Sequence, residues 1–460
     1  MQRENWGSKF GFIMAAAGSA VGLGNIWRFP YVTGENGGGA FVFVYVLCVV
    51  LIGAPLLFNE MALGRITAKS PIGSIKESGG KGFWYLGAIL SISVSFFVLS
   101  YYGVIAGWTI GYIYTSLMSI EMNFAEFQAN MMYIIPLFAL FMGITAWIVK
   151  GGISGGIEKA SKILMPVLFV LVFLVILRSV TLPGAGEGIK YYLTPDFSKI
   201  NGGVVLAAIG QAFFSMSIGW GIMITYGSYL PKSENIVSSG LWVGFTDAAV
   251  ALLGGLMIFP AVFAFGKAPN QGTELVFSVL PEIFNSMPAG GNIVGALFFL
   301  LLCIAALTSS ISILEVPVSY LIDEKGMSRN KSTWIMTTLI FLVGIPSAMS
   351  KGGSEWLSTM QLSIFGSTYT GFLDIVDYIF GTFIIVVAAL MICIYTVWIY
   401  SGTKMIGELE QGNEWFTQPL IGAASPAKIW VFFMKYVCPT VILLVLLNMI
   451  GIFGIFSGGG

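Results

Sequence analysis

The sequence predicts an all-α polytopic membrane protein with eleven transmembrane helices. Of the 460 residues, 57% are hydrophobic and only 10% are charged, whereas soluble domains have roughly 45–50% apolar and about 25% charged residues. Apolar stretches of about 20 residues recur along the whole chain, and a helix of that length crosses a hydrocarbon core of ~30 Å. These two observations exclude a soluble fold.

Breaks rich in charge, proline or glycine divide the apolar stretches into eleven expected spans. They are 10–33, 38–63, 84–118, 131–148, 157–179, 203–230, 238–264, 292–322, 333–349, 370–402 and 427–456. No polar stretch approaches the ~50 residues that a separate soluble domain needs. We therefore expect residues 1–460 to form a single transmembrane domain.

The distribution of basic residues predicts the orientation in the membrane. With a cytoplasmic N-terminus, fifteen Lys and Arg residues lie on the cytoplasmic side and five lie outside, in agreement with the positive-inside rule. The odd number of spans then places the C-terminus outside.

Charge and composition exclude several classes of function. The 22 basic and 22 acidic residues give no net charge, so the sequence offers no attraction to nucleic acid. The chain has no histidine, the residue that serves most often as a general base and metal ligand. No nucleophile and base converge in the sequence pattern, so we do not expect an enzyme.

Two expected spans contain helix-breaking segments. Residues 17–25 include three glycines within seven positions, and residues 214–221 repeat the feature in the sixth span. Each glycine weakens a helix by about 1 kcal/mol relative to alanine, and unwound backbone in a membrane is tolerated only where protein buries it or where it lines a polar cavity. The alternative is that the small residues only let helices pack closely.

The two breaks lie five spans apart, which is the spacing of two inverted repeats. We expect a first repeat over 10–179 (helices 1–5), a second repeat over 203–402 (helices 6–10) and an additional helix 11 over 427–456. The two breaks would then share one cavity in the middle of the membrane.

Broken helices offer binding groups for ions of both signs. Free N–H groups at half-helix N-termini suit a carboxylate, and freed carbonyl groups suit Na⁺. Thr308 and Ser309 on the eighth span could join the carbonyls of Gly18 and Val21 around such a cation, or they could simply bond back to their own helix. Arg28 follows the first break and could pair with Asp377, either as a reversible gate or as a static ion pair.

Several segments closely resemble the signature of the neurotransmitter:sodium symporters. They are Trp6, residues 18–30 and 35–41, Tyr101 with Tyr102, residues 210–215 and residues 306–310. The resemblance covers spans one to ten in order. It implies a leucine-transporter-like fold, with a bacterial member's eleven spans, and a location in the bacterial inner membrane.

The resemblance also implies two sodium sites and a substrate site, with every residue carried over by position. One sodium ion would bind the carbonyls of Gly18, Val21 and Ala305 and the hydroxyls of Thr308 and Ser309. The other would bind Ala20, Asn25, Ser215 and Asp247 beside the substrate carboxylate. The substrate would contact Ala20, Leu23, Gly24, Asn25, Val98, Tyr102, Phe214, Ser217, Gly219, Trp220, Ser309 and Ile313.

Further positions of the family concern the gates and chloride. The external gate would be Arg28 with Asp377, and Tyr102 with Phe214 would form a lid below it. The internal gate would be Arg3 with Asp323, backed by Trp6 and Tyr229. Gly156 and Pro166 resemble a motif that lets the start of the fifth helix unwind, because proline removes a helical hydrogen bond.

Chloride-dependent relatives surround the anion with four polar side chains. Tyr45, Gln211 and Ser215 are present here, but the last position aligns with Val250 or Ala251. The resemblance therefore implies a chloride-independent protein in which Asp247 or Glu60 supplies the negative charge.

The expected function is sodium-coupled symport of a hydrophobic or aromatic L-amino acid by alternating access. Gly22 stands where monoamine transporters of the family carry an Asp, which favours a substrate with its own carboxylate. One alternative is a proton-coupled amino acid transporter that titrates Asp247, Glu60 or Glu315, and another is a membrane sensor that binds amino acids without transporting them. The sequence leaves the preferred amino acid, the number of ions per cycle and the oligomeric state open.

Overall fold

The structure is a computed structural model that describes residues 4–270, 274–287, 290–419 and 424–452. Helices dominate the first half of the chain, where wide π-helical turns (η) interrupt several of them. The elements are α1 (Lys9–Ala20), η1 (Gly24–Arg28), α2 (Phe29–Glu35), α3 (Gly39–Cys48), η2 (Val49–Gly53), α4 (Ala54–Thr67), α5 (Pro71–Glu77), the 3₁₀ turn η3 (Gly82–Trp84), α6 (Tyr85–Leu117), α7 (Phe124–Ala129), α8 (Met131–Val149), η4 (Ile153–Glu158), α9 (Lys159–Val180), α10 (Ala185–Leu193) and the 3₁₀ turn η5 (Phe197–Lys199).

The second half is also mostly helical. Its elements are α11 (Gly202–Ser215), α12 (Ile222–Gly227), α13 (Ile236–Ala264), η6 (Leu275–Val279), α14 (Leu280–Ser286), α15 (Gly291–Lys325), α16 (Arg329–Met349), α17 (Glu355–Thr359), β1 (Gln361–Ile364), β2 (Ser367–Thr370), α18 (Phe372–Val376), η7 (Asp377–Ile384), α19 (Ile385–Ile394), η8 (Tyr395–Ser401), α20 (Gly402–Leu409), the 3₁₀ turn η9 (Glu414–Phe416), α21 (Pro426–Phe432), η10 (Phe433–Val437) and α22 (Cys438–Met449).

The predicted all-α polytopic membrane fold is confirmed. Nine helical stretches in the described residues are long and apolar enough to cross a membrane, and α1 with η1–α2 makes a tenth that is bent by 47°. The remaining expected span, 203–230, consists of α11 and α12 with a break between them. The division of the chain into repeats at 10–179 and 203–402, with 427–456 as an added helix, stays a prediction.

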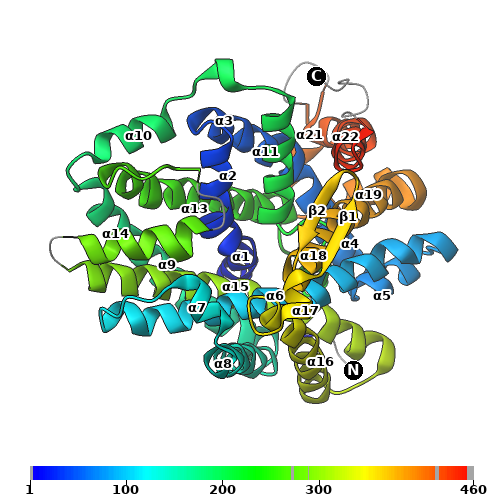
Figure 1. The fold of residues 1–460 in the computed structure, drawn as a ribbon. Helices are drawn as coiled ribbons and strands as arrows, with labels where there is room; N and C mark the ends of the chain where they lie inside the picture. Colours follow the sequence, from blue (N-terminus) through cyan, green and yellow to red (C-terminus); the bar gives the residue numbers. More distant parts are fainter. Residues whose placement is uncertain (1–3, 271–273, 288–289, 420–423, 453–460) are drawn as a thin grey trace.

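The first broken helix lies in the middle of the molecule. α1 contacts α9, α13 and α15, and α15 in turn makes extensive contact with α6. Figure 1 shows α1 and α2 near the centre of the view, with α13 beside them and the hairpin β1–β2 on the other side. Long helices therefore enclose the unwound backbone, as a break inside a membrane requires.

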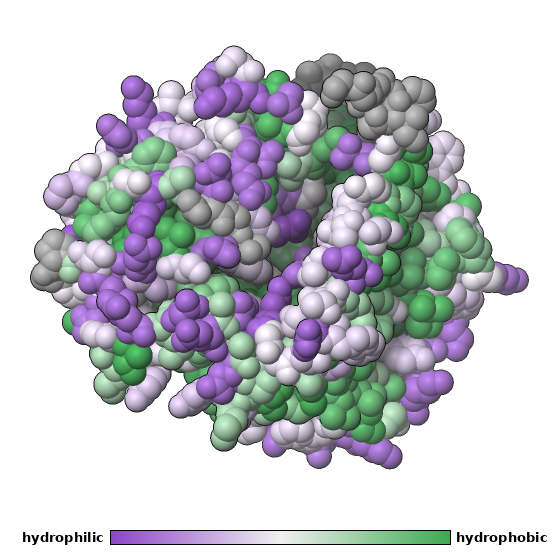
Figure 2. Space-filling model, in the orientation of Figure 1, coloured by the Kyte–Doolittle hydropathy of each residue, from purple (hydrophilic) through white to green (hydrophobic). Residues whose placement is uncertain are grey.

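The sequence did not predict the short hairpin β1–β2. β1 and β2 pair antiparallel, with Gln361 opposite Thr370 and Ile364 opposite Ser367. The hairpin lies at the same end of the molecule as α2, and Figure 2 shows a hollow beside it near the middle of this face. We call this end the Arg28 end, and the opposite end, where the N-terminal segment packs, the Trp6 end.

Candidate functional site

The break in the first span leaves backbone groups that neighbouring side chains take up. α1 ends at Ala20, and Val21 is extended, with φ −77° and ψ 102°. The Gly22 N–H donates to Asn25 Oδ1 at 3.1 Å, and the Leu23 N–H donates to the Tyr102 hydroxyl at 3.2 Å. A Cβ at Gly22 would lie 3.0 Å from the Tyr102 hydroxyl oxygen and would collide with Ser309 Oγ, so only glycine fits between them.

Two hydroxyls of α15 face the carbonyls that the break sets free. Ser309 Oγ lies 3.4 Å from the Gly18 carbonyl oxygen, 3.1 Å from that of Ser19 and 3.3 Å from that of Val21. Thr308 Oγ1 lies 3.5 Å from the Val21 oxygen and also bonds back to its own helix, at 3.0 Å from the Ala305 oxygen and 3.2 Å from the Ile304 oxygen. Each hydroxyl has one proton to donate, yet each is surrounded by several acceptors. A cation at the centre would satisfy all these oxygens together.

A second polar cluster surrounds Asp247 on α13. Asn25 Nδ2 lies 2.7 Å from Asp247 Oδ1 and 3.0 Å from Ser215 Oγ, and the Ser215 hydroxyl donates to Oδ1 at 2.6 Å. Tyr45 donates to Asp247 Oδ2 at 3.2 Å. All four side chains are buried. A buried carboxylate of this kind needs such donors or a cation, because an isolated buried charge is very costly.

The chemistry of the two clusters suits a singly charged hard cation. The described residues contain no group of three His, Cys, Asp or Glu side chains that could hold a metal ion. The two clusters instead offer carbonyls, hydroxyls, one amide and one carboxylate, which are oxygen donors that a hard cation prefers. Sodium fits this donor set, whereas a transition metal does not.

The break in the sixth span is built on left-handed backbone. Ser217, Gly219 and Gly221 have φ of 55°, 85° and 75°. Glu60 on α4 accepts the Gly219 N–H at 2.7 Å, and the Ser95 hydroxyl donates to the Trp220 carbonyl at 2.8 Å. Side chains from two other spans therefore hold this segment in place.

A small cavity lies between the two breaks. Its walls are Ser19, Ala20, Gly22, Gly24, Tyr102, Phe214, Ser215, Ser217, Trp220, Ser309 and Ile313. The cavity volume of about 20 Å³ is room for little more than one water molecule. An amino acid could enter only if side chains such as Phe214 and Trp220 move.

Eight of the twelve expected substrate contacts line this cavity, and four do not. Leu23 and Gly219 instead present N–H groups to Tyr102 and Glu60. Asn25 belongs to the Asp247 cluster, and Val98 is fully buried on α6. The expected sodium ligands Ala20 and Ala305 lie, respectively, in the cavity wall and beside Thr308.

The expected gate residues at the Arg28 end are not paired with each other in the described structure. Asp377 Oδ1 accepts the Tyr101 hydroxyl at 2.6 Å. The Arg28 guanidinium carbon lies 4.4 Å from the centre of the Phe214 ring. Each charged side chain thus contacts an aromatic residue, Asp377 the Tyr101 hydroxyl and Arg28 the Phe214 ring. The hollow in Figure 2 opens at this same end.

The Trp6 end is tightly closed. The Trp6 indole N–H donates to the Tyr226 carbonyl at 3.1 Å, and the ring packs edge-on against Phe12 and Tyr226. Arg3 lies outside the described residues, so its expected pair with Asp323 has no structural description. Asp323 Oδ2 accepts the Ser70 N–H at 2.6 Å.

A different ion pair at the Trp6 end was not anticipated. Arg329 Nη1 lies 2.8 Å from Glu315 Oε2, and Arg329 Nε lies 2.9 Å from Glu4 Oε1. Tyr229 donates to Glu315 Oε1 at 2.7 Å. The sequence showed Glu315 as a charge within a span, but its partner begins the next helix and only the fold brings the two together.

The N-terminal segment is also bound to the start of the fifth span. Glu158 accepts the Gly7 N–H at 2.6 Å and the Ser8 hydroxyl at 2.8 Å, and Glu4 accepts the Ile153 N–H at 2.7 Å. Gly156 lies in the wide turn η4, and Pro166 lies inside α9. The stretch with the expected motif is thus helical here, with an irregular first turn.

Comparison with known proteins gives consistent matches over nearly the whole chain. A family model described as the sodium:neurotransmitter symporter family matches residues 3–133 and 126–453. An uncharacterized sodium-dependent transporter of Bacillus subtilis (strain 168), YhdH, is 39% identical, over 97% of this chain and 98% of its own length. A sodium-dependent transporter of Haemophilus influenzae is 36% identical, over 97% of this chain and 98% of its own length.

A solved structure agrees with these matches. The crystal structure of MhsT in complex with L-phenylalanine superposes with a TM-score of 0.86 and 39% sequence identity, covering 97% of this chain and 100% of that one. The similarity therefore extends beyond the shared membrane architecture to the sequence.

Proposed function

Because the chain belongs to the sodium:neurotransmitter symporter family of sodium-dependent transporters, we propose that it imports a hydrophobic or aromatic L-amino acid together with sodium by alternating access. The observation that carries this proposal is the placement of the Ser309 hydroxyl among the carbonyls of Gly18, Ser19 and Val21. A relative that is 39% identical was crystallised with L-phenylalanine.

The proposed binding of two sodium ions follows the two oxygen clusters. One ion binds the carbonyls of Gly18, Val21 and Ala305 with the hydroxyls of Thr308 and Ser309. The other binds near Asn25, Ser215 and Asp247. The first ion would link the break in the first span to α15, so its binding favours the arrangement in which these elements are close.

The substrate is proposed to bind between the two breaks. Its carboxylate would meet the Tyr102 hydroxyl and the N–H groups near the first break, where a half-helix presents the positive end of its dipole. Its side chain would lie against Phe214, Trp220 and Ile313. Gly22 leaves no space for an acidic side chain that would bind an amine, which supports a substrate that carries its own carboxylate.

The proposed orientation puts the N-terminus in the cytoplasm and the C-terminus outside, in a bacterial inner membrane. The Arg28 end would then face outward and the Trp6 end inward. The excess of basic residues on one side, fifteen against five, supports this orientation. With the Trp6 end closed and Arg28 apart from Asp377, the site would be reached from outside, and Arg28 and Asp377 would pair when the substrate closes this end.

Chloride independence is proposed from the same cluster around Asp247. Its buried carboxylate already provides a fixed negative charge beside Asn25 and Ser215. An added anion at this position would meet that charge at short range and be repelled.

Uptake into proteoliposomes tests the proposed function. A panel of radiolabelled amino acids would be supplied with an inward gradient of Na⁺ or choline, in chloride or in gluconate. The proposal expects uptake of hydrophobic or aromatic amino acids with Na⁺ in both anions. Uptake driven by a pH gradient without Na⁺ would show a proton-coupled transporter, and binding without uptake would show a sensor.

A further inference from the structure

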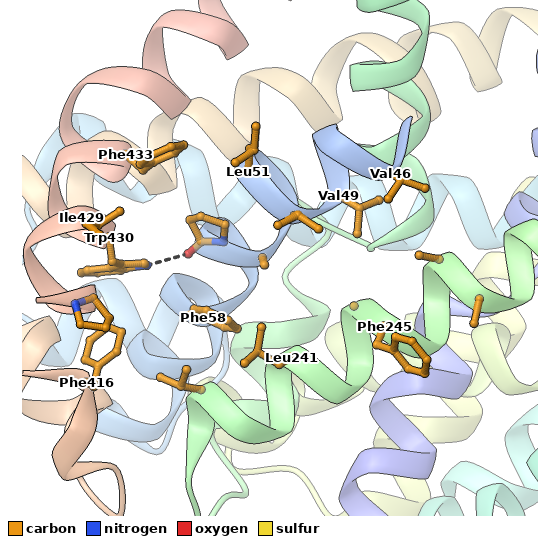
Figure 3. A pocket seen from close by; sticks show the side chains of 18 of the residues that line it. Val46, Val49, Leu51, Phe58, Leu241, Phe245, Phe416, Ile429, Trp430 and Phe433 are labelled. Carbon is orange, nitrogen blue, oxygen red and sulfur yellow. Dashed lines mark hydrogen bonds between the residues drawn. The ribbon is translucent and has the colours of Figure 1, made fainter. Parts of the chain in front are cut away.

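A groove much larger than the cavity between the two breaks opens on the side of the molecule. Three parts of the chain form its walls: α3–η2–α4, α13, and the segment from η9 through α21 to η10. Its volume is about 560 Å³. In Figure 3, Phe416, Ile429, Trp430 and Phe433 form one wall, and Val46, Val49 and Leu51 face Leu241 and Phe245 across the opening.

The groove offers an occupant only hydrocarbon. Its lining contains no charged residue. The Trp430 indole N–H, a polar group in the wall, is used by the Pro55 carbonyl at 3.1 Å, the bond drawn in Figure 3. Water would find few partners there, so the groove favours an apolar occupant.

The rim is continuous with the apolar outer surface. Val50 is 59% exposed, Phe245 65% and Leu241 48%. These side chains belong to helices that cross the membrane. The groove therefore opens into the bilayer, where hydrocarbon chains surround it.

The length of the groove matches a single lipid chain. At 1.5 Å per residue, the walls from Val46 to Phe58 and from Val237 to Leu252 extend ~18 Å and ~22 Å. One leaflet contributes about half of the ~30 Å hydrocarbon core. One end of the groove is formed by Trp415 and Phe416, in the connection before α21, and tryptophan is typical of the boundary between hydrocarbon and headgroups. The groove thus runs from that boundary through one leaflet.

We propose that this groove is a specific binding site for one phospholipid of the bilayer, with an acyl chain between α4, α13 and α21 and the headgroup at the Trp415 end. Apolar side chains reach it from all three walls, so the chain is enclosed more fully than one on a flat helix surface. The chain is not transferred from water, so closer van der Waals contact on three sides is what holds it more tightly than bulk lipid.

The groove is connected to the centre of the molecule through α13. Gly244 and Ala248 line the groove on α13, and the fully buried Asp247 lies between them in the sequence of the same helix. A Cβ at Gly244 would contact Met216, in the break of the sixth span. An acyl chain here therefore supports the helix that separates lipid from the Asp247 cluster.

Filling the groove tests this proposal. Leu241→Trp places a larger side chain in the opening, and Val50→Trp does so from the opposite wall. Leu342→Trp is the matched control, because Leu342 on α16 is 53% exposed and does not line the groove. Each full-length protein would be extracted from membranes, washed at length in detergent and analysed by mass spectrometry for bound phospholipid.

We expect the unsubstituted protein and Leu342→Trp to retain about one phospholipid per chain, and both groove variants to retain at least about threefold less. Equal retention in all four proteins would overturn the proposal, as would loss of all phospholipid from the unsubstituted protein. A dimer that Leu241→Trp dissociates and Leu342→Trp does not would show that a second copy of the chain covers the groove instead.

A measurement in the membrane covers the case in which the variants fold poorly. The unsubstituted protein and Trp430→Phe would be placed in vesicles of phosphatidylcholine with brominated acyl chains, which quench nearby tryptophans. The proposal predicts that a larger share of the fluorescence of Trp430, obtained as the difference between the two proteins, is quenched than of the average tryptophan. No quenching of Trp430 would contradict an acyl chain in the groove.

Discussion

The hydroxyl oxygen of Ser309 lies 3.3 Å from the carbonyl oxygen of Val21, the residue at which the first helix stops. The two residues are 288 positions apart in the chain, and they meet because α15 packs against the break in α1. The same hydroxyl is within hydrogen-bonding distance of two further carbonyls. This concentration of acceptors around one donor is the strongest structural argument for a cation.

Removing a hydroxyl from this cluster should weaken sodium binding. We expect Thr308→Val and Ser309→Ala each to raise the half-maximal Na⁺ concentration for uptake by at least about tenfold, which corresponds to about 1.4 kcal/mol. Ser310→Ala is the matched control, since the buried Ser310 hydroxyl has no hydrogen-bond partner in the described structure. A sodium dependence that is the same in all three variants would argue against this site.

Removing the charge of Asp247 should have a comparable effect at the second cluster. Asp247→Asn keeps the size of the side chain but removes the charge that faces Asn25 and Ser215. We expect an increase of at least about tenfold in the half-maximal Na⁺ concentration, measured with chloride and with gluconate. Asp374→Asn is the control, because Asp374 pairs with Lys351 near the hairpin. If both variants behave alike, Asp247 is not a sodium ligand.

Loss of the Tyr102 hydroxyl should affect the substrate and not sodium. In Tyr102→Phe the Leu23 N–H loses its acceptor, and the substrate loses a donor for its carboxylate. Hydrogen bonds to charged groups contribute about 1.5–3 kcal/mol, so we expect the half-maximal substrate concentration to rise at least about tenfold in equilibrium binding assays. Tyr112 lies on α6 as Tyr102 does, and its hydroxyl donates to the Phe277 carbonyl. Tyr112→Phe is therefore the control and should leave substrate binding unchanged.

Trp220 should set the upper size of the substrate. Its ring lines the cavity and packs edge-on against Phe214. We expect Trp220→Ala to shift the preference toward larger side chains by roughly tenfold, since each methylene in such a pocket contributes about 1–3 kcal/mol. Competition between alanine, leucine and tryptophan for uptake measures this shift, with Trp242→Ala on the outer surface as control. An unchanged order of preference would show that another residue limits size.

The pair Arg329–Glu315 should be required for stability at the Trp6 end. Glu315 is fully buried, so Arg329→Gln leaves a buried charge with only Tyr229 as partner, and such changes cost about 3–5 kcal/mol. We expect a lower thermal unfolding midpoint, and partial recovery in the double variant Arg329→Gln/Glu315→Gln. Lys76→Gln, which affects a largely exposed pair with Glu324, should change little. The absence of any recovery in the double variant would contradict this account.

The membrane fold could be predicted from the sequence because hydropathy directly reports which segments cross the bilayer. The break at 17–25 could be predicted too, because each of its three glycines weakens the helix relative to alanine. The break predicted at 214–221 in the sixth span is confirmed, because Ser217, Gly219 and Gly221 adopt positive φ and divide the span into α11 and α12. The hairpin was missed because two four-residue strands leave too short a pattern.

The parts of the site that depend on local chemistry could be predicted from the sequence, and the parts that depend on the packing of distant helices could not. Thr308 and Ser309 could be matched to the break because hydroxyls and freed carbonyls are complementary. The contact of Arg329 with Glu315 and Glu4, and the groove beside α13, depend on how helices distant in sequence pack together. The pairing of Arg28 with Asp377 depends on which end of the molecule is open, and a sequence does not specify that state.

Coupled flux of sodium and substrate is the most direct test of the account. Proteoliposomes would receive ²²Na⁺ and a tritiated hydrophobic amino acid together, and the entry of both would be measured over the same seconds. The account predicts substrate-dependent Na⁺ entry at about two ions per amino acid, lost together with amino acid uptake in Thr308→Val and Ser309→Ala but not in Ser310→Ala. Amino acid entry without accompanying Na⁺ would contradict it.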